Sequence, residues 1–243
     1  MSIYETHPDL VAKFDSVMDE LDTTDSRKQE LDCAQRLIRL AERLVDAAPD
    51  DADAYQMLGL AWYGFPRHSS WRSWHCRAAL DKALALAPDH AWVHKTLGYL
   101  LFDQERYRDA LHHLSKVDRS IFESPQFEWE LLKVQELCLV CQLRLSPSTL
   151  PADFATFCTA YLAAKAREDE AIELGSTEPL HELPECAEWL LEQGAESQET
   201  PLREILAFLY RFRSEVSFWN PAYAAALEDA QEDAVKQGFA TDC

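Results

Sequence analysis

The stretch with the most potential for chemistry is "YGFPRHSSWRSWHCR", which covers residues 63–77. It contains four aromatic side chains, three arginines, two histidines and one cysteine, and no acid, in a chain with 43 acidic residues. Such a mixture suits a catalytic site, a metal site or a docking surface for another molecule. Because His68 and His75 have no further ligand at metal-binding spacing, the stretch favours molecular contact over chemistry.

Two histidines elsewhere have the spacing of zinc ligands. His90 and His94 lie four residues apart and would share one face of a helix, as the histidines of zinc proteases do. The segment "HAWVHKTLGY" lacks the glutamate of the H-E-x-x-H pattern, and His90 stands where a helix would begin. We therefore predict that His90 caps a helix and that His94 lines a groove, with no metal between them.

One cysteine pair has the spacing of a redox or metal motif. Cys138 and Cys141 form C-x-x-C in "QELCLVCQLRL", but no second pair follows at the spacing of a zinc ribbon. The surrounding apolar residues predict a central helix, in which both cysteines act as small hydrophobic side chains.

Patterns of nucleophilic catalysis and phosphate binding are absent from the sequence. There is no G-x-S-x-G segment, and the six glycines match neither of the common phosphate-binding loops. We therefore expect a protein that is not an enzyme and that uses no metal or cofactor. A helical enzyme or metal protein remains the third of three hypotheses.

The composition restricts the class of partner. Basic residues number 23 and acidic residues 43, which gives a formal charge of −20 that would repel a nucleic-acid backbone. We expect a protein or peptide partner, with a basic one favoured, and no nucleic acid. Seven scattered cysteines predict reduced thiols, and neither a signal peptide nor a membrane-length apolar span is found. A cytoplasmic protein without membrane contact is the resulting expectation.

Apolar residues recur at intervals of three and four, and good helix formers dominate, so we predict an all-α chain. Prolines at positions such as Pro8, Pro151 and Pro221 fit the first turn of a helix. The short connections predict antiparallel helical hairpins. The expected helices cover residues 8–21, 27–48, 52–63, 70–87, 90–103, 106–118, 125–145, 151–173, 182–193, 200–217 and 220–237.

A composition change near "ELGSTEPLHELP" predicts a domain boundary at 173/174. Residues 1–173 would form the repeat region with its amino-terminal helices, and 174–243 an acidic helical part packed on that region. From Lys165 to Glu204 there are twelve acids against three bases. These acids form either a solvated helical face or a surface that steers a basic partner.

An internal repeat is visible at an offset of 39 residues, where "LVDAAPDDADAYQMLGLAW" matches "ALALAPDHAWVHKTLGYLL". The glycines of the two copies, Gly59 and Gly98, would let a neighbouring helix approach closely. Over residues 50–118 the pattern resembles the tetratricopeptide repeat (TPR) family, if about five residues are inserted in the first hairpin. The resemblance implies a short α-solenoid of stacked helical hairpins. The matched pairs are Ala48 with Ala87, Pro49 with Pro88, Asp50 with Asp89, Ala52 with Ala91, Leu58 with Leu97 and Gly59 with Gly98.

In the family, the first helices of successive hairpins line a concave groove that binds an extended peptide or a helix of another protein. The resemblance therefore implies groove positions at Tyr55, Gln56, Leu60, Lys95 and Tyr99. Gln56 and Leu60 stand where a lysine and an asparagine would clamp a carboxylate in some members. Binding of chaperone tails is therefore not expected.

The inserted aromatic stretch would begin the second helix of the first repeat. Cys76, Leu80 and Ala83 then share a packing stripe, while Trp71 and Trp74 point away from the core of the hairpin. Either the amino-terminal helices bury the two indoles, or the indoles stay partly exposed as a contact site. The residues of that contact site would be Phe65, Arg67, Trp71, Arg72 and Trp74.

The sequence thus favours a non-enzymatic TPR-like scaffold that binds a protein or peptide partner in its helical groove. The alternative is an immunity or antitoxin type of inhibitor, whose acidic surface neutralises a basic toxin. This alternative predicts one tight partner whose binding weakens with salt, whereas a general adaptor would bind short peptides.

Overall fold

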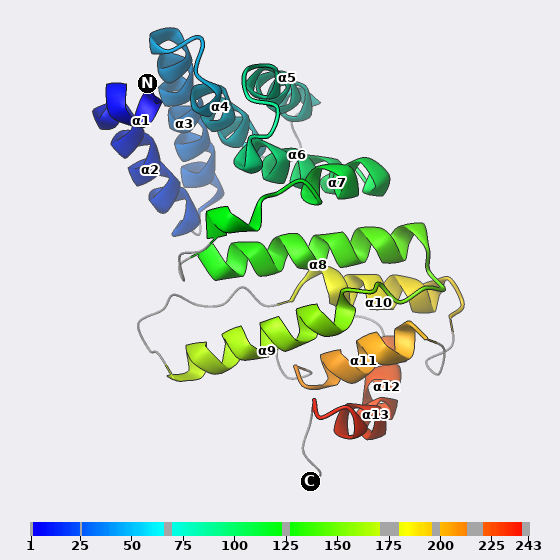
Figure 1. Ribbon diagram of the computed structural model, residues 1–243. Coiled ribbons are helices and arrows are strands. Elements are labelled where there is room, and N and C mark those ends of the chain that lie inside the picture. The colour runs from blue at the N-terminus through cyan, green and yellow to red at the C-terminus, as the bar shows by residue number, and fades with distance from the viewer. Residues whose placement is uncertain are drawn as a thin grey trace. The chain divides into compact units, whose positions relative to one another are not determined.

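The computed structural model describes residues 2–24, 26–65, 70–122, 127–170, 180–195, 200–212 and 221–239 (Figure 1). All regular secondary structure in these ranges is helical, which confirms the prediction of an all-α chain. None of the helices in the described ranges has the length and apolar character that crossing a membrane requires.

Packing divides the chain into two compact units, residues 1–118 and 119–243. The boundary predicted at 173/174 therefore falls inside the second unit. This division arises because α8 (Glu128–Leu145) packs against both α9 (Phe154–Glu170) and α10 (Glu182–Glu192), which lie on either side of the predicted boundary.

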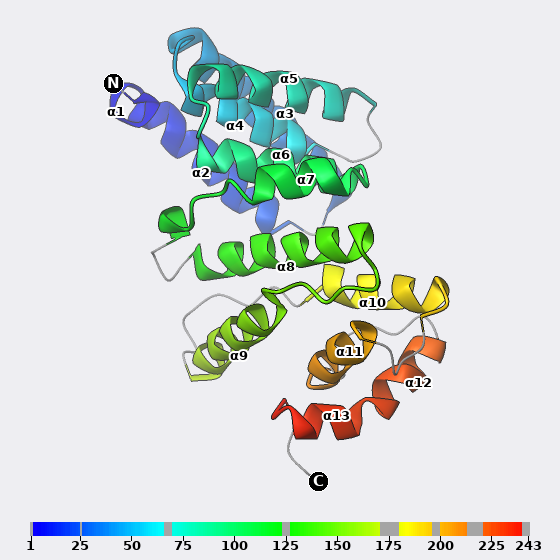
Figure 2. The ribbon, with the colours of Figure 1, turned by 45° about the vertical axis from the view of Figure 1, so that its right-hand side comes forward.

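The first unit consists of seven helices over its described residues, and most begin and end within two residues of the predicted bounds. The α4 and α5 helices pack as one hairpin and α6 and α7 as the next, with α6 also in contact with α4 and α5 (Figure 2). A separate pair, α2 and α3, packs against α4 through α3. The bounds are α1 Ile3–Thr6, α2 Pro8–Asp22, α3 Arg27–Ala47, α4 Ala52–Tyr63, α5 Ser70–Leu86, α6 Ala91–Asp103 and α7 Tyr107–Leu114.

Polar side chains cap the amino-terminal ends of α4 and α6. Asp51 caps α4 by accepting a hydrogen bond from the Asp53 amide, and the His90 ring caps α6 by accepting one from the Val93 amide. The predicted capping role of His90 is confirmed. The Nε2 atom of His90 also lies 2.8 Å from an oxygen of Asp53, so the two hairpin starts are joined.

The core of the first hairpin follows the predicted stripe on α5. Cys76, Leu80 and Ala83 are all buried and pack against α6 residues such as Val93 and Leu97. A second apolar cluster links α1 to α4 and includes Phe14, Leu37, Leu44 and Met57. The two clusters fix α4 between the amino-terminal helices and α5.

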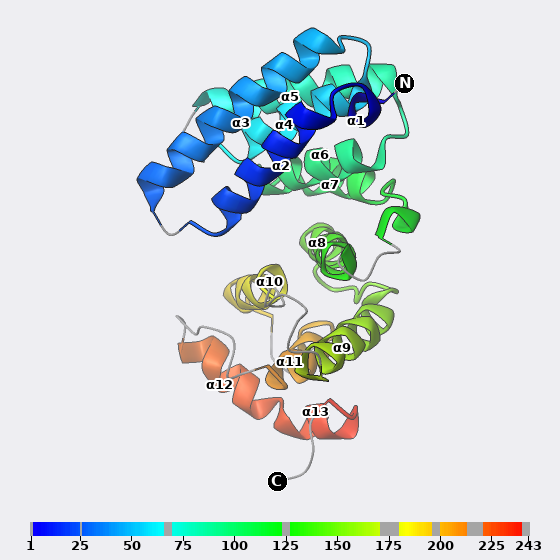
Figure 3. The same ribbon diagram turned by 90° about the vertical axis from the view of Figure 1, so that its left-hand side faces the viewer.

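The second unit contains a short 3₁₀ turn, η1 (Arg119–Phe122), and six helices over its described residues, viewed along α8 in Figure 3. Aromatic rings from α9, α11 and the carboxy-terminal turn pack edge to face around Phe208. The predicted last helix, 220–237, is divided by a turn at Ala230. The remaining bounds are α11 Leu202–Tyr210, α12 Pro221–Asp229 and α13 Gln231–Lys236.

Candidate interaction surface

The two tryptophans of the opening stretch lie on the solvent side of α5. Trp71 is 66% exposed and Trp74 is 64% exposed, whereas Cys76 and Leu80 on the opposite side of the helix are fully buried. The outward orientation predicted from the helix geometry is confirmed. The amino-terminal helices leave both indoles uncovered, so the choice between burial and exposure is decided in favour of exposure.

Neighbouring rings hold this surface in place. The His75 ring stacks on Trp62 at 4.3 Å between ring centres and meets Trp74 edge to face at 4.6 Å. Trp71 lies 6.2 Å from the same histidine ring, and Phe65 lies 5.6 Å from Trp62. We call Trp62, Phe65, Trp71, Trp74 and His75 the aromatic corner. Because the rings support one another, the two exposed indoles are held at low conformational cost.

Sequence reasoning missed two members of the aromatic corner. Trp62 enters the sequence prediction only as the last residue of the first repeat copy, and His75 only as a possible metal ligand. The spacing of Trp71 and His75, four residues apart on one helix, is the signal that predicts their contact.

Arg72 is the clearest difference from the predicted contact site. Its side chain is buried, donates to the Tyr63 carbonyl at 2.7 Å and pairs with Asp103 at 3.1 Å. The guanidinium also lies over the Tyr63 ring, 4.6 Å from its centre. Arg72 therefore joins the end of α4 to the start of α5 and the end of α6, and it offers no surface to a partner. Arg67 lies outside the described residues.

The predicted groove positions on α4 are partly covered. Gln56 is buried, and Leu60 packs against the apolar cluster of the amino-terminal helices. Tyr55 is half-buried beside the Cys76 cluster, with the Lys82 ammonium 5.8 Å from its ring centre. The cause is α3, which packs against α4 and occupies part of its surface.

The predicted groove positions on α6 lie together. The Lys95 ammonium lies 4.7 Å from the Trp92 ring and 5.5 Å from the Tyr99 ring. Lys95 is 9% exposed, so little of its charge faces solvent, and Tyr99 is half-buried. The five groove candidates are therefore distributed over α4 and α6, which are in contact, and their role in binding stays a prediction.

His94 does not line a groove, because it is buried between α6 and α7. Its Nδ1 atom lies 2.9 Å from Nδ1 of His113, and its Nε2 atom lies 3.0 Å from the Pro88 carbonyl. Burial lowers the pKa of both rings, that of His113 to about 4. His113, on α7, is half-buried.

The Cys138 and Cys141 pair lies on α8, as predicted. Cys141 is buried, and burial raises the pKa of its thiol to about 12. A thiol with such a pKa stays protonated at neutral pH, so it is neither a good nucleophile nor a ready metal ligand.

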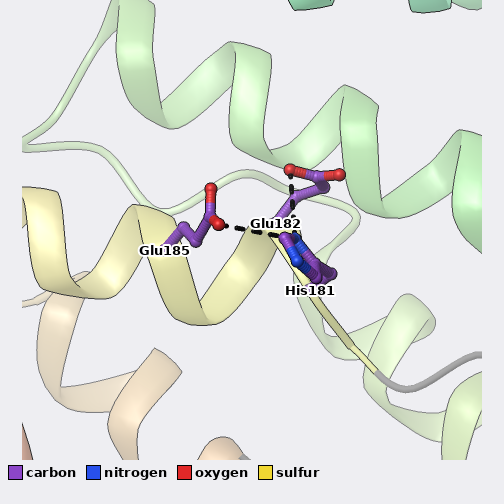
Figure 4. Close-up of side chains that lie close together, drawn as sticks. All are labelled: His181, Glu182 and Glu185. Atoms are coloured by element: carbon purple, nitrogen blue, oxygen red, sulfur yellow. Dashed lines mark ion pairs between the residues drawn. The ribbon is translucent and has the colours of Figure 1, made fainter. Parts of the chain in front are cut away.

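One cluster within the described ranges has three possible metal-ligand side chains, His181, Glu182 and Glu185 at the start of α10 (Figure 4). His181 Nδ1 lies 3.8 Å from a Glu182 oxygen and 3.5 Å from a Glu185 oxygen. The other Glu182 oxygen lies 3.1 Å from the Lys133 ammonium. Since this positive charge opposes a bound cation and both His181 and Glu185 are exposed, we assign no metal site here.

No protein-family model, curated protein or solved structure matches the chain. The role of the aromatic corner is therefore inferred from its own residues and their surroundings.

Proposed function

We propose that this chain is a non-enzymatic, TPR-like interaction module that holds a protein or peptide partner, with the aromatic corner as its main contact. The observation that carries the proposal is the exposure of Trp71 and Trp74, at 66% and 64%. Tryptophan is the residue type most enriched at binding hot spots, and two adjacent exposed indoles form an unusual apolar surface. A partner that covers both rings gains their apolar burial.

The repeat interpretation is supported by two equivalent close contacts. Leu80 of α5 lies against Gly59 of α4, and Leu114 of α7 lies against Gly98 of α6. Leu80 follows its glycine by 21 residues and Leu114 by 16, which agrees with an insertion of five residues in the first hairpin. Part of this difference lies in α5 itself, which begins ten residues before Leu80, whereas α7 begins seven residues before Leu114.

The predicted groove contributes a secondary contact in this proposal. Tyr55, Leu60 and Tyr99 are half-buried, while Gln56 and Lys95 are almost fully buried. A partner would therefore meet the aromatic corner first and contact the groove through the exposed parts of its tyrosines.

The test is capture of partners from the native cell with the full chain, followed by binding measurements on the purified partner. We expect the double variant Trp71→Ala/Trp74→Ala to lose at least about tenfold in affinity, because it removes both hot-spot rings. Tyr4→Ala is the control, since Tyr4 is a 51% exposed aromatic residue outside the corner. Equal binding by the double variant and the control would exclude the corner as the contact.

The second candidate is an inhibitor of a basic protein such as a toxin, favoured by the formal charge of −20. Glu228, Asp229 and Glu232 are exposed on α12 and α13 and would meet such a partner. Salt would then weaken binding strongly, because exposed charges are screened beyond about 10 Å at 0.1 M salt. Measuring affinity while the salt concentration rises from 0.05 M to 0.5 M distinguishes the two candidates, because binding through the indoles is nearly insensitive to salt.

A further inference from the structure

A hollow of about 460 Å³ lies between α2 and α3, on the amino-terminal hairpin of the first unit. Val17 and Leu40 supply its apolar lining, and none of the described residues that line it carries a carboxylate. The cationic lining contrasts with the whole chain, in which acids outnumber bases by 43 to 23. The four cationic residues are Lys13, Arg36, Arg39 and Arg43.

Most of this positive charge is uncompensated. Arg36 pairs with Glu20 at 2.8 Å and with Asp32 at 3.8 Å. Lys13, Arg39 and Arg43 make no ion pair with any residue within the described ranges, and all three are exposed. An anion entering the hollow would therefore find three cations that are not already neutralised.

The stability of α3 does not explain this arrangement. Arg36, Arg39 and Arg43 follow one another at spacings of three and four, which places them on one face of the helix. Like charges at these spacings weaken a helix slightly. The acids of the same stretch, Glu42 and Asp46, do not line the hollow.

The unpaired positive charge is also distributed unevenly along the hairpin of α2 and α3. Arg36 and Glu20 meet at the end nearer the turn between the helices, where Glu20 lines a second, polar hollow. Because α2 and α3 run in opposite directions, Lys13 and Arg43 belong to the other end. Unpaired positive charge therefore concentrates at the Lys13 and Arg43 end, with Val17 and Leu40 between the two ends.

We propose that this basic hollow binds an acidic peptide segment of a partner protein. Carboxylates of the segment pair with Arg39, Arg43 and Lys13, and an apolar side chain rests on Val17 and Leu40. Guanidinium groups suit this role because their planar donors bind a carboxylate through two parallel hydrogen bonds. The apolar lining favours a peptide over a small inorganic anion, which would leave the exposed part of Leu40 without a contact. The site is separate from the aromatic corner and of opposite charge to the chain as a whole.

The test is selection from a random peptide display library on the full chain, in parallel with the variant Arg39→Glu/Arg43→Glu. We expect the wild-type chain to enrich peptides with glutamate or aspartate around an apolar residue. A synthesised selected peptide should bind the charge-reversed variant at least about tenfold more weakly, because two attractive contacts become repulsive. Inorganic phosphate should not displace that peptide at equal concentration.

The matched control is Lys28→Glu/Arg108→Glu, which changes net charge equally at two exposed positions that line neither hollow. It should bind the peptide like the wild type, as should Trp71→Ala/Trp74→Ala. Arg39→Gln/Arg43→Gln replaces Arg39→Glu/Arg43→Glu as the test variant if the latter does not fold. Enrichment of neutral or basic peptides, unchanged binding by the Arg39 and Arg43 variants, or displacement by phosphate would each overturn the proposal.

Discussion

Leu80 of α5 lies over Gly59 of α4 so closely that a Cβ atom on the glycine would stand 2.3 Å from the leucine Cδ2 atom. Leu114 stands in the same relation to Gly98, where the corresponding distance would be 2.4 Å. The two glycines occupy equivalent positions in the repeat and set the approach of the second helix in each hairpin. Alanine at either position would force the leucine side chain to move.

We predict that Gly59→Ala and Gly98→Ala each destabilise the fold by about 1 to 3 kcal/mol, because overpacking forces the leucine side chain and its helix to move. The better helix propensity of alanine offsets only about 1 kcal/mol of this cost. Urea unfolding measures the change in free energy. Gly64→Ala is the control, since its Cβ would lie no closer than 3.6 Å to a neighbour. Unchanged stability in the first two variants would refute the close-approach explanation.

Exposure of the indoles has a consequence for stability as well as for binding. Trp71→Ala and Trp74→Ala should each change the free energy of unfolding by no more than about 0.5 kcal/mol, as is usual for surface positions. Leu97→Ala, at a fully buried position of α6, should cost about 2 to 5 kcal/mol in the same assay. A loss near the Leu97 value at either tryptophan would show that the ring belongs to the core.

Much of the first unit could be predicted because its determinants are local. Apolar spacing predicts the bounds of α4 and α5, and the packing stripe on α5 follows from a rotation of about 100° per residue. Contacts between distant residues could not be found in this way. Arg72 reaches Asp103, 31 residues later, and no local pattern marks that pair.

The net charge of the chain does not indicate the basic hollow, for a related reason. The formal charge of −20 is a sum over the whole chain, whereas the hollow depends on which faces of α2 and α3 meet. Arg39 and Arg43 alternate with acids along the sequence, so a local charge count near them is close to neutral. The cations come together only in the folded hairpin, where α2 places Lys13 beside the three arginines of α3.

The His94 and His113 pair makes stability depend on pH. Burial lowers the pKa of both rings, that of His113 to about 4, below the unfolded value of about 6.5. The unfolded chain therefore binds more protons, so the contribution of the pair is present above about pH 6.5 and is lost as the pH falls toward 4. Other charged groups near the pair, His112, Lys116 and Arg77, also disfavour protonation.

We therefore expect urea unfolding of the wild type to lose stability between pH 6.5 and 4.5, and His113→Phe to lose less over that interval. An exposed histidine outside the pair supplies the control, because His181→Gln in the second unit leaves the contact between His94 and His113 unchanged. If His113→Phe and the wild type show the same change in unfolding free energy with pH, the pair is not the origin of the dependence.

Glu136 of α8 forms the amino-terminal cap of another helix, α10. One of its oxygens accepts hydrogen bonds from the amides of His181, Glu182 and Leu183, at 3.2, 2.9 and 2.8 Å. Its other oxygen lies 3.3 Å from the Lys133 ammonium. Burial raises the pKa of the carboxyl, while Lys133 and the Leu183 amide oppose that rise. These contacts join α8 to α10 within the second unit.

Glu136→Ala should therefore cost about 3 kcal/mol or more, because three amides lose their acceptor and Lys133 loses its buried partner. Glu136→Gln should cost less, since its amide oxygen still accepts the amide hydrogen bonds although the charge is gone. Urea unfolding followed by circular dichroism measures both. Glu185→Ala is the control, because this exposed glutamate on α10 contacts only the His181 ring among the described ion pairs. Equal losses for Glu136→Ala and Glu185→Ala would show that the cap contributes nothing beyond an ordinary surface carboxylate.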